Sequence, residues 1–359
     1  MKETNSVSHE IFLYHALTEA KKRRGFCAPH PCVGAVAVHQ GQVIAQAYHH
    51  SPGEPHAEVA VLSAIPIGIK NLSLYVTLEP CNHWGKTPPC VKAILDYGVG
   101  TVIFGFKDPN IHVPENDTLE ILKTHGVKVI YHPLPEITKF YQSYQHWVDK
   151  KRPFITAKWA QSFDAKVGFL SSRAYLTNSI ANQFTHQQRS QTDIILTSAN
   201  TILVDDPKLN ARLSDSSFGK TIAVLDTHLR LTGREQFFKH SEQVHIFHAP
   251  NQKPTFYLPT VIYHPICETN LGLCLQTLVM KLAELGFHDV WLEAGPTLMA
   301  AMHQEKLVQV THIFLVPTIL GEKGIHAYQL DYHFFSQPFE LQSEQMNDNI
   351  LTTFIWQEH

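Results

Sequence analysis

Residues 56–90 read HAEVAVLSAIPIGIKNLSLYVTLEPCNHWGKTPPC, and this stretch decides how the first half of the chain folds. Its beginning, HAEVAVLSAI, predicts a short buried helix, and LSLYVTLEP predicts a strand that ends at a proline. A cysteine follows that proline, and a second cysteine opens another helical segment, CVKAILDYGVG. Helices that alternate with short apolar strands predict a layered α/β domain.

The flanking sequence extends the same pattern in both directions. Residues 11–25, IFLYHALTEAKKRRG, place apolar side chains at helical spacing and end in cations and a glycine, which predicts an opening amphipathic helix. VGAVAVHQGQVIAQAYHH predicts two strands joined by a turn at Gln40-Gly41. Beyond residue 100, TVIFGFKDP, LEILKTHG and VKVIYH predict a strand, a helix and a strand.

The length of the chain predicts a second domain, because 359 residues exceed the roughly 100–200 residues of one domain. An aromatic and charged segment runs from Phe140 to Lys151, and Pro153 precedes a new strand, FITAKWAQ. We therefore place the boundary near residues 148–152 and predict domains of residues 1–149 and 150–359. In the second half, DIILTSA, TIAVLDT, QVHIFHA, DVWLEAG and HIFLVPTIL predict strands, while LCLQTLVMKLAELG and TLMAAMHQEKL predict helices, so this domain is again α/β.

Composition excludes several classes of protein. The net charge of −3, with 44% hydrophobic and 17% charged residues, gives no strong field for nucleic acid or an anionic membrane. No stretch approaches ~18 consecutive apolar residues, and the polar beginning of the sequence is unlike a secretory signal. Six cysteines are too few for a disulfide scaffold in a chain of this length. We expect a cytoplasmic homo-oligomer with no membrane or nucleic-acid partner.

The spacing of His56, Glu58, Cys81 and Cys90 predicts a catalytic zinc site. Zinc prefers about four nitrogen and sulfur ligands in a tetrahedron, and a catalytic site keeps one position for water. One histidine and two thiolates leave that position, and bound zinc lowers the pKa of the water towards about 7. Glu58 stands two residues after the histidine at a helix start, where it can move protons without ligating the metal. This set of residues is typical of zinc-dependent deaminases.

Two non-catalytic interpretations compete with the prediction of a catalytic zinc site. His83 could complete a closed structural zinc site, or the two cysteines could be unrelated buried thiols. The glutamate, the proline before Cys81 and the placement of that cysteine between a strand and a helix all favour catalysis.

The loop between the two cysteines indicates which family of zinc deaminases the chain resembles. Eight residues, NHWGKTPP, separate Cys81 and Cys90, whereas zinc deaminases commonly have two. With GEPHAEV and FKDPN, this segment resembles the deaminase half of the bifunctional deaminase-reductases of riboflavin biosynthesis. In that family the loop holds the ribose phosphate of a pyrimidine substrate, and a second histidine contacts it. The resemblance implies that the substrate-binding residues are His30, His49, His83, Lys86 and Thr87.

The second half resembles the reductase half of the same family. PFITAKWAQSFDAKVG, TDIILTSANTILVDDPKLNARL, VWLEAGPTLMAAMHQEKLVQ and VPTILG follow its motifs in order. The resemblance implies a fold similar to that of dihydrofolate reductase, an NADPH cofactor, and reduction of the ribosyl ring to a ribityl chain. It places the substrate at Arg189, Asp205, Arg212 and Glu293, and the cofactor at Lys158, Ser162, Ser198, Asn200, Thr201 and Gly295.

Several positions depart from the family pattern. His30 stands where the family has an asparagine, and Glu115 and Asp117 stand where it has glycines. In the reductase half, Ala165 replaces the glycine of Asp-Gly-Lys, and Tyr175 replaces a tryptophan. Further departures are Ser198-Ala199-Asn200-Thr201 for GxGT, Asn210 for a threonine and Pro317-Thr318 for Pro-Lys.

Three hypotheses follow. The first is the complete pathway enzyme, which deaminates 2,5-diamino-6-(5-phosphoribosylamino)pyrimidin-4-one and then reduces its ribosyl chain with NADPH. The second is a paralogous zinc deaminase acting on a related aminopyrimidine or purine, with a weak or inactive reductase domain. The third is a non-enzymatic nucleotide-binding protein with a relict zinc site, which the intact zinc and glutamate residues disfavour. A nucleic-acid editing enzyme would need a basic groove, which the charge pattern does not supply.

Overall fold

The computed structural model describes residues 3–66, 68–82, 84, 88–110, 118–169, 175–270, 272–328 and 337–357. The chain divides into two compact units, Met1–Lys151 and Arg152–His359. Among the described residues, none of the helices has the length and apolar character needed to cross a membrane.

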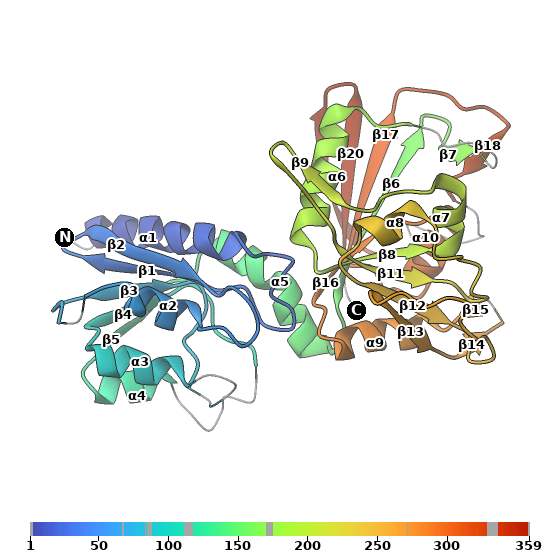
Figure 1. Ribbon diagram of the computed structural model, residues 1–359. Helices are drawn as coiled ribbons and strands as arrows, with labels where there is room; N and C mark the ends of the chain where they lie inside the picture. The colour runs from blue at the N-terminus through green and yellow to red at the C-terminus, as the bar shows by residue number, and fades with distance from the viewer. Residues whose placement is uncertain are drawn as a thin grey trace. The chain divides into compact units, whose positions relative to one another are not determined.

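The first unit is built on a five-stranded mixed sheet (Figure 1). The strand order is β2-β1-β3-β4-β5; β1 pairs antiparallel with both β2 and β3, whereas β3, β4 and β5 run parallel. The predicted turn between the first two strands lies at Gln40-Gly41, where both residues have positive φ, as a tight hairpin requires. The strands are β1 (Gly34–His39), β2 (Gln42–Tyr48), β3 (Ser73–Val76), β4 (Thr101–Phe104) and β5 (Lys128–Tyr131).

Helices cover both faces of this sheet, so the unit has three layers. Alternate residues of β1 face opposite sides: Val36 and Val38 pack against α1 and α5, and Ala35 and Ala37 pack against α2. Two hydrophobic clusters therefore lie one on each side of the sheet. The helices are α1 (Glu3–Lys21), α2 (Ala57–Ser63), α3 (Cys90–Tyr97), α4 (Thr118–Thr124) and α5 (Pro135–Lys150).

Helix α1 approaches β1 most closely at Gly34. A Cβ atom at this position would lie 2.0 Å from the carbonyl oxygen of Ala16 and 2.5 Å from the nitrogen of Ala20. The backbone N–H of Gly34 also donates to Thr77 Oγ1 at 3.1 Å. Glycine at residue 34 thus lets the helix backbone contact β1 at the point where β1 meets Thr77, the residue that follows β3 on the way to Cys81.

The second unit contains a nine-stranded sheet in the order β13-β12-β11-β8-β16-β6-β17-β20-β19. The first seven of these strands are parallel, and β20 and β19 add an antiparallel edge. The strands are β6 (Phe154–Ser162), β8 (Ile194–Ser198), β11 (Thr221–Leu225), β12 (Val244–His248), β13 (Val261–Pro265), β16 (Asp289–Leu292), β17 (Val310–Val316), β19 (Phe339–Met346) and β20 (Asn349–Trp356).

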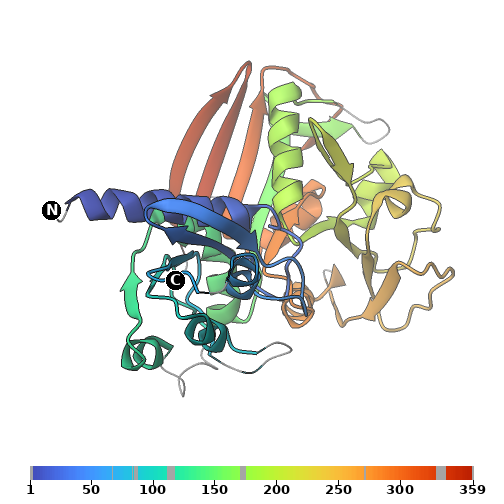
Figure 2. The same ribbon diagram turned by 60° about the vertical axis from the view of Figure 1, so that its left-hand side comes forward.

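Helices again pack on both faces of the large sheet. Helices α9 (Leu275–Glu284) and α10 (Pro296–Gln304) share a cluster with apolar residues of β6, β8 and β16. Helices α7 (Ala199–Asp205) and α8 (Gln236–His240) pack on the opposite face. Helix α6 (Ser179–Gln191) contacts β17 and β20 through Ala181, and Figure 2 shows this light-green helix lying along those strands.

Three two-stranded antiparallel sheets complete the second unit. One pairs β7 (Lys166–Phe169) with the distant β18 (Gly324–His326), and the other two are hairpins of β9 (Ala211–Leu213) with β10 (Ser216–Phe218) and of β14 (Glu268–Thr269) with β15 (Gly272–Leu273).

The α/β class predicted for both halves is confirmed, and every helix and strand named from the sequence is present. Helices α5, α6, α7 and α8, strand β13, the final hairpin of β19 and β20 and the three two-stranded sheets were not predicted. Helix α5 carried a signal, because Ile137, Phe140, Tyr141, Tyr144 and Val148 recur at helical spacing and are buried. The aromatic character of the segment obscured that periodicity.

Gly34→Ala will destabilise the first unit, because the added methyl group overlaps backbone atoms that cannot move independently. We expect a loss of about 3 kcal/mol, at the upper end of overpacking costs, measured by urea denaturation. Gly100→Ala is the matched control, since its Cβ would lie 3.6 Å from the nearest atom. Equal unfolding midpoints for the two variants would contradict this close packing.

Candidate active sites in the two units

His56, Cys81 and Cys90 converge at the N-terminal ends of two helices. His56 is the N-cap of α2, Cys90 is the first residue of α3, and Cys81 follows β3. The Sγ atom of Cys81 lies 3.4 Å from His56 Nδ1 and 3.4 Å from Cys90 Sγ, and His56 Nδ1 lies 3.2 Å from Cys90 Sγ. The three donor atoms thus form one compact cluster.

This cluster fits a zinc ion. A zinc–sulfur bond of about 2.3 Å and a tetrahedral angle place two ligand sulfurs about 3.8 Å apart. The separation of 3.4 Å between the two sulfurs needs only a small expansion to reach that value. Among the described residues, these three form the one group of histidine, cysteine or acidic side chains able to share a metal. Three protein ligands leave a fourth position for water, as catalytic zinc sites do.

The polarity of the site favours thiolates. The backbone N–H of Cys90 points at Cys81 Sγ from 3.4 Å. Hydrogen bonds from Cys90 and His56 lower the pKa of the Cys81 thiol. Unpaired N–H groups at a helix N-terminus stabilise a negative sulfur in the same way.

Glu58 lies beside the cluster in the first turn of α2. Its side chain is buried, with 3% of the residue exposed, and it faces the same cavity as His56 and Cys81. Burial, followed by the charge of Cys81, raises the pKa of Glu58 to about 7. A carboxyl group in this position can accept a proton and return it near neutral pH.

A cavity of about 300 Å³ opens in front of the cluster. Two sequence-predicted residues, His30 and His49, lie in its wall with their rings stacked, at a centroid distance of 5.4 Å. The ring of His49 also lies 5.3 Å from that of His56. Cys90 lies behind the cavity wall and is fully buried.

The hydrogen bonds of His49 fix its tautomer. Its Nδ1 lies 3.2 Å from the carbonyl oxygen of Pro55, which can only accept, so Nδ1 carries the proton. Burial lowers the pKa of His49, which keeps the ring neutral. Its Nε2 is buried and has no hydrogen-bond partner among the described residues. This nitrogen is therefore an acceptor available to a substrate N–H group.

The other predicted residues of this site, His83, Lys86 and Thr87, lie outside the described residues, as do Glu115 and Asp117.

Sequence reasoning missed part of the cavity wall. Asp108 Oδ1 accepts hydrogen bonds from the backbone N–H of Asn110 at 2.9 Å and from the Tyr144 hydroxyl at 3.2 Å. Tyr144 and Trp147, three residues apart on α5, also line the cavity. The FKDPN motif pointed to Asp108 and Asn110, but the two aromatic residues became visible as wall residues only through the packing of α5.

A second cavity, of about 370 Å³, lies in the second unit at the carboxyl ends of β6, β8 and β16. Such ends of parallel strands are frequent ligand sites in α/β sheets. Eight of the predicted residues line it: Lys158, Arg189, Asn200, Thr201, Asp205, Arg212, Glu293 and Gly295.

Arg189 and Glu293 form a two-pronged ion pair in the wall of this cavity. Arg189 Nε donates to Glu293 Oε1 at 2.6 Å, and Nη2 donates to Oε2 at 2.8 Å. The Trp291 indole N–H donates to the same carboxylate at 2.7 Å. Burial raises the pKa of Glu293, but the charge and hydrogen bonds of Arg189 outweigh that effect, with Lys158 and Trp291 adding to it, and lower the pKa to about 2.

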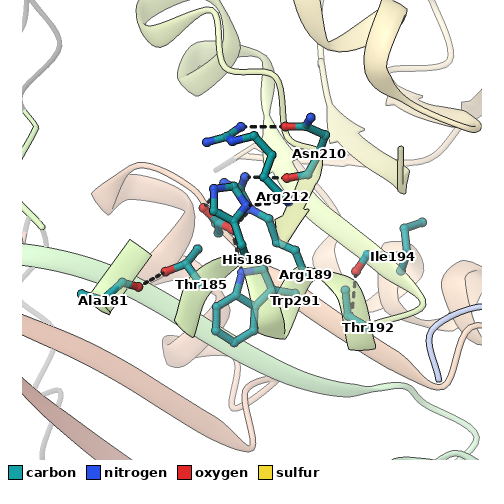
Figure 3. A network of polar contacts seen from close by, with 10 residues as sticks. Ala181, Thr185, His186, Arg189, Thr192, Ile194, Asn210, Arg212 and Trp291 are labelled. Carbon is teal, nitrogen blue, oxygen red and sulfur yellow. Dashed lines mark hydrogen bonds and ion pairs between the residues drawn. The ribbon is translucent and has the colours of Figure 1, made fainter. Parts of the chain in front are cut away.

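Asn210 connects the two arginines. Its carbonyl oxygen accepts from Arg189 Nη1 at 3.1 Å, and its Oδ1 accepts from Arg212 Nη1 at 2.7 Å (Figure 3). The sequence marked Asn210 only as a departure from a family threonine. In the structure it orients Arg212 towards the cavity.

His186 belongs to the same group and was not predicted. It lies three residues before Arg189 on α6, and its Nδ1 accepts from the backbone N–H of Arg212 at 3.3 Å. Burial and the charges of the two arginines lower the pKa of His186 to about 4, so the ring is neutral and carries its proton on Nε2.

Two predicted cofactor residues do not line the cavity. The hydroxyl of Ser162 is fully buried and donates to Asp164 Oδ1 at 2.6 Å in the turn after β6. Ser198 is the N-cap of α7, where its Oγ accepts from the N–H of Thr201. Thr201 Oγ1 in turn accepts from the backbone N–H of Gly295 at 3.1 Å. Both serines therefore support the cavity wall from behind.

The comparisons with known families cover both units. Residues 6–106 match the cytidine and deoxycytidylate deaminase zinc-binding region, and residues 153–335 match the RibD C-terminal domain.

Individual proteins resemble nearly the whole chain. The riboflavin biosynthesis protein RibD of Aquifex aeolicus is 31% identical over 311 residues, which cover 86% of each chain. RibD of Escherichia coli is 30% identical over 327 residues, covering 87% of this chain and 88% of its own.

Solved structures agree with these matches. Acinetobacter baumannii RibD superposes with a TM-score of 0.83 at 27% identity, covering 98% of this chain and 100% of its own. A Thermotoga maritima diaminohydroxyphosphoribosylaminopyrimidine deaminase/5-amino-6-(5-phosphoribosylamino)uracil reductase gives 0.84 at 28%, covering 98% and 99%.

The Arg189–Glu293 pair makes the stability of the second unit depend on pH. Because the folded-state pKa of Glu293 is depressed from 4.5 to about 2, its contribution is complete above pH 4.5 and is lost as the pH falls towards 2. The difference corresponds to a contribution on the order of 3 kcal/mol. Glu293→Gln will remove this part of the acid dependence, as measured by calorimetric unfolding across that interval.

Glu284→Gln is the control for this measurement. Its carboxylate pairs with Lys281 on the surface, with 66% of the glutamate side chain exposed, and such pairs contribute little. The control should keep the acid dependence of the unmodified protein. An unchanged acid dependence in Glu293→Gln would contradict the depressed pKa.

Proposed function

Because the chain belongs to the RibD family of riboflavin-biosynthesis proteins, we propose which of its residues carry out each of the two reactions of that family. The protein is a bifunctional enzyme, a zinc-dependent deaminase and an NADPH-dependent reductase. The proposal assigns the deaminase to residues 1–149 and the reductase to residues 150–359. The observation that carries it is the cluster of His56, Cys81 and Cys90 in front of a cavity that also holds Glu58.

The proposed deaminase reaction replaces an amino group of a pyrimidine with oxygen from water and releases ammonia. Zinc held by His56, Cys81 and Cys90 would supply a water activated at neutral pH. Glu58 would accept one proton from the attacking water and pass it to the ring nitrogen. It would then take the second proton, from the hydroxyl group added to the ring carbon, and pass it to the amine, which leaves as ammonia. Its burial beside the metal ligands and its raised pKa support this role.

His49 and His30 are proposed to bind the pyrimidine ring. The free Nε2 of His49 accepts a hydrogen bond from a ring N–H or amino group, and the stacked ring of His30 borders the same space. His83, Lys86 and Thr87 are proposed to hold the ribose phosphate, because a cation and hydroxyl and imidazole donors suit an anionic group.

The proposed reductase reaction takes place in the second cavity. NADPH supplies the hydride, so the protein contributes position and charge. Arg189, Arg212, Asp205 and Glu293 are proposed to hold the phosphorylated sugar, since guanidinium groups bind phosphate through two donors. Lys158, Asn200, Thr201 and Gly295 are proposed to border the cofactor, with Ser162 and Ser198 supporting them from behind.

The location and assembly of the protein stay predictions: a cytoplasmic homo-oligomer acting on a small phosphorylated pyrimidine, without nucleic-acid or membrane partners.

His30 favours a second candidate within the same chemistry. Its imidazole borders the proposed ring site at a position where the family has an asparagine, so the enzyme would accept a related aminopyrimidine or purine. A panel of such bases separates the two candidates. If the riboflavin intermediate is deaminated fastest, the pathway enzyme is supported and the second candidate fails.

Glu58→Gln will lower ammonia release from 2,5-diamino-6-(5-phosphoribosylamino)pyrimidin-4-one by about 10²–10⁴-fold, the usual contribution of a general acid–base group. Zinc content, measured by elemental analysis, will stay near that of the unmodified protein, because Glu58 is not a ligand. Oxidation of NADPH with the deaminated intermediate will also continue at its original rate, because the reductase site lies in the other unit.

Glu120→Gln serves as the control, since this exposed carboxylate of α4 does not line the cavity. It should retain both activities. Loss of zinc together with activity in Glu58→Gln would refute the proposed role of the glutamate, and no NADPH oxidation by the unmodified enzyme would refute the reductase proposal.

A further inference from the structure

Cys267 and Cys274 face each other across the small hairpin that precedes α9. The hairpin pairs Glu268 with Leu273 and Thr269 with Gly272, so the next pair in register is Cys267 with Cys274. The backbone N–H of Cys274 donates to the carbonyl oxygen of Cys267 at 2.8 Å. Hydrogen-bonded pairs of antiparallel strands have Cα atoms about 5.5 Å apart, and disulfides span about 4.4–6.8 Å between Cα atoms. The backbone therefore already holds the two residues at bridging distance.

A threonine on the first turn of α9 contacts one of the two thiols. Thr277 Oγ1 lies 3.2 Å from Cys267 Sγ. Cys274 continues the register of the hairpin opposite Cys267, and residues directly opposite each other on antiparallel strands project from the same face. Both side chains therefore point to the same side of the hairpin.

The surroundings of Cys274 favour its thiolate. Cys274 is the N-cap of α9, a ten-residue helix, and its side chain makes no capping hydrogen bond. The hydroxyl and N–H of Thr277, together with the Cys267 thiol and the N–H of Gln276, lower the pKa of Cys274. Thiolates rather than thiols attack oxidants. Cys267 is exposed and stands opposite Cys274 in the register of the hairpin, which makes it the candidate for the second thiol.

We propose that Cys267 and Cys274 form a redox-active dithiol, which a peroxide converts reversibly to a disulfide. Neither residue lines the two cavities of the proposed active sites, so the inference does not depend on the proposed function.

The chemistry balances with one peroxide per dithiol. The Cys274 thiolate attacks a peroxide oxygen and breaks the O–O bond, which gives a sulfenic acid and releases hydroxide. The Cys267 sulfur then attacks the sulfenic sulfur, loses its proton and displaces the hydroxyl group as water. Two thiols are oxidised, one peroxide is reduced, and two molecules of water form in total. An external dithiol reverses the bridge by exchange.

The chain contains a matched pair of thiols for comparison. Cys27 and Cys32 both donate to the carbonyl oxygen of Arg23, at 3.5 Å and 3.4 Å. Cys27 is fully buried as well. These two thiols should resist the peroxide that oxidises Cys267 and Cys274.

The test treats the zinc-loaded full-length protein with hydrogen peroxide, alkylates the remaining thiols and maps the peptides by mass spectrometry. The peptide that contains both Cys267 and Cys274 should lose two hydrogens, and dithiothreitol should restore them. Cys27 and Cys32 should remain alkylated. The proposal is overturned if Cys267 and Cys274 stay reduced, if Cys27 and Cys32 oxidise equally fast, or if the products are only overoxidised acids.

Single variants test which thiol attacks. In Cys267→Ser, dimedone should trap a sulfenic acid on Cys274, whereas Cys267 in Cys274→Ser should be labelled several-fold more slowly. Thr277→Val should slow disulfide formation several-fold without changing either enzymatic activity. Equal labelling in the two cysteine variants would refute the assignment of Cys274 as the attacking thiol.

Discussion

The metal site constrains the fold of the whole first unit, because one metal ion needs three donor atoms at fixed separations. His56 starts one helix, Cys90 starts another, and Cys81 ends the connection from a central strand. These residues can meet only if both helices pack on the same face of the sheet with their N-termini level. The apolar residues of α2 and α3 provide that packing in one hydrophobic cluster. On the opposite face, Gly34 lets α1 approach β1 closely, which fixes the strand that leads towards the cavity.

In the second unit, the main constraint is the burial of charged side chains. Burying an arginine and a carboxylate is costly unless each is paired and hydrogen-bonded. Arg189 and Glu293 meet this condition through two direct contacts, and Trp291 and the backbone of Asn210 satisfy further atoms. The pair links α6 to the end of β16, so the cavity wall and the core depend on the same interaction. The site is charged yet rigid, as a pocket that positions a sugar phosphate and a hydride donor needs to be.

The fold accommodates the residues that depart from the family pattern, and for one of them the cost in conformational free energy is evident. Ala165 has a φ of +54°, a conformation that suits the glycine of the family and is unfavourable for alanine by roughly 1–2 kcal/mol. The turn persists because Asp164 accepts hydrogen bonds from the N–H groups of Leu320 and Gly321, which pin it to the segment after β17. Asn210 has taken up a connecting role between two arginines. Among the described departures, His30 lies in the wall of the deaminase cavity and Tyr175 in the wall of the reductase cavity, whereas Ala165 and Asn210 act through local hydrogen bonds and backbone conformation.

The sequence by itself determined which of the predicted segments are helices and which are strands. It also identified the histidine and two cysteines that can hold a metal ion. Periodicity is local, and the chemistry of a histidine, a glutamate and two cysteines does not depend on the rest of the fold. It did not identify α5, whose aromatic residues obscured a helical repeat, or the roles of His186 and Asn210. Tertiary structure alone decided the roles of His186 and Asn210, because their contacts join residues from separate elements. His186 meets Arg212, 26 positions away, and Asn210 meets Arg189, 21 positions away. A cavity is a property of several elements at once, and no single segment of sequence contains it.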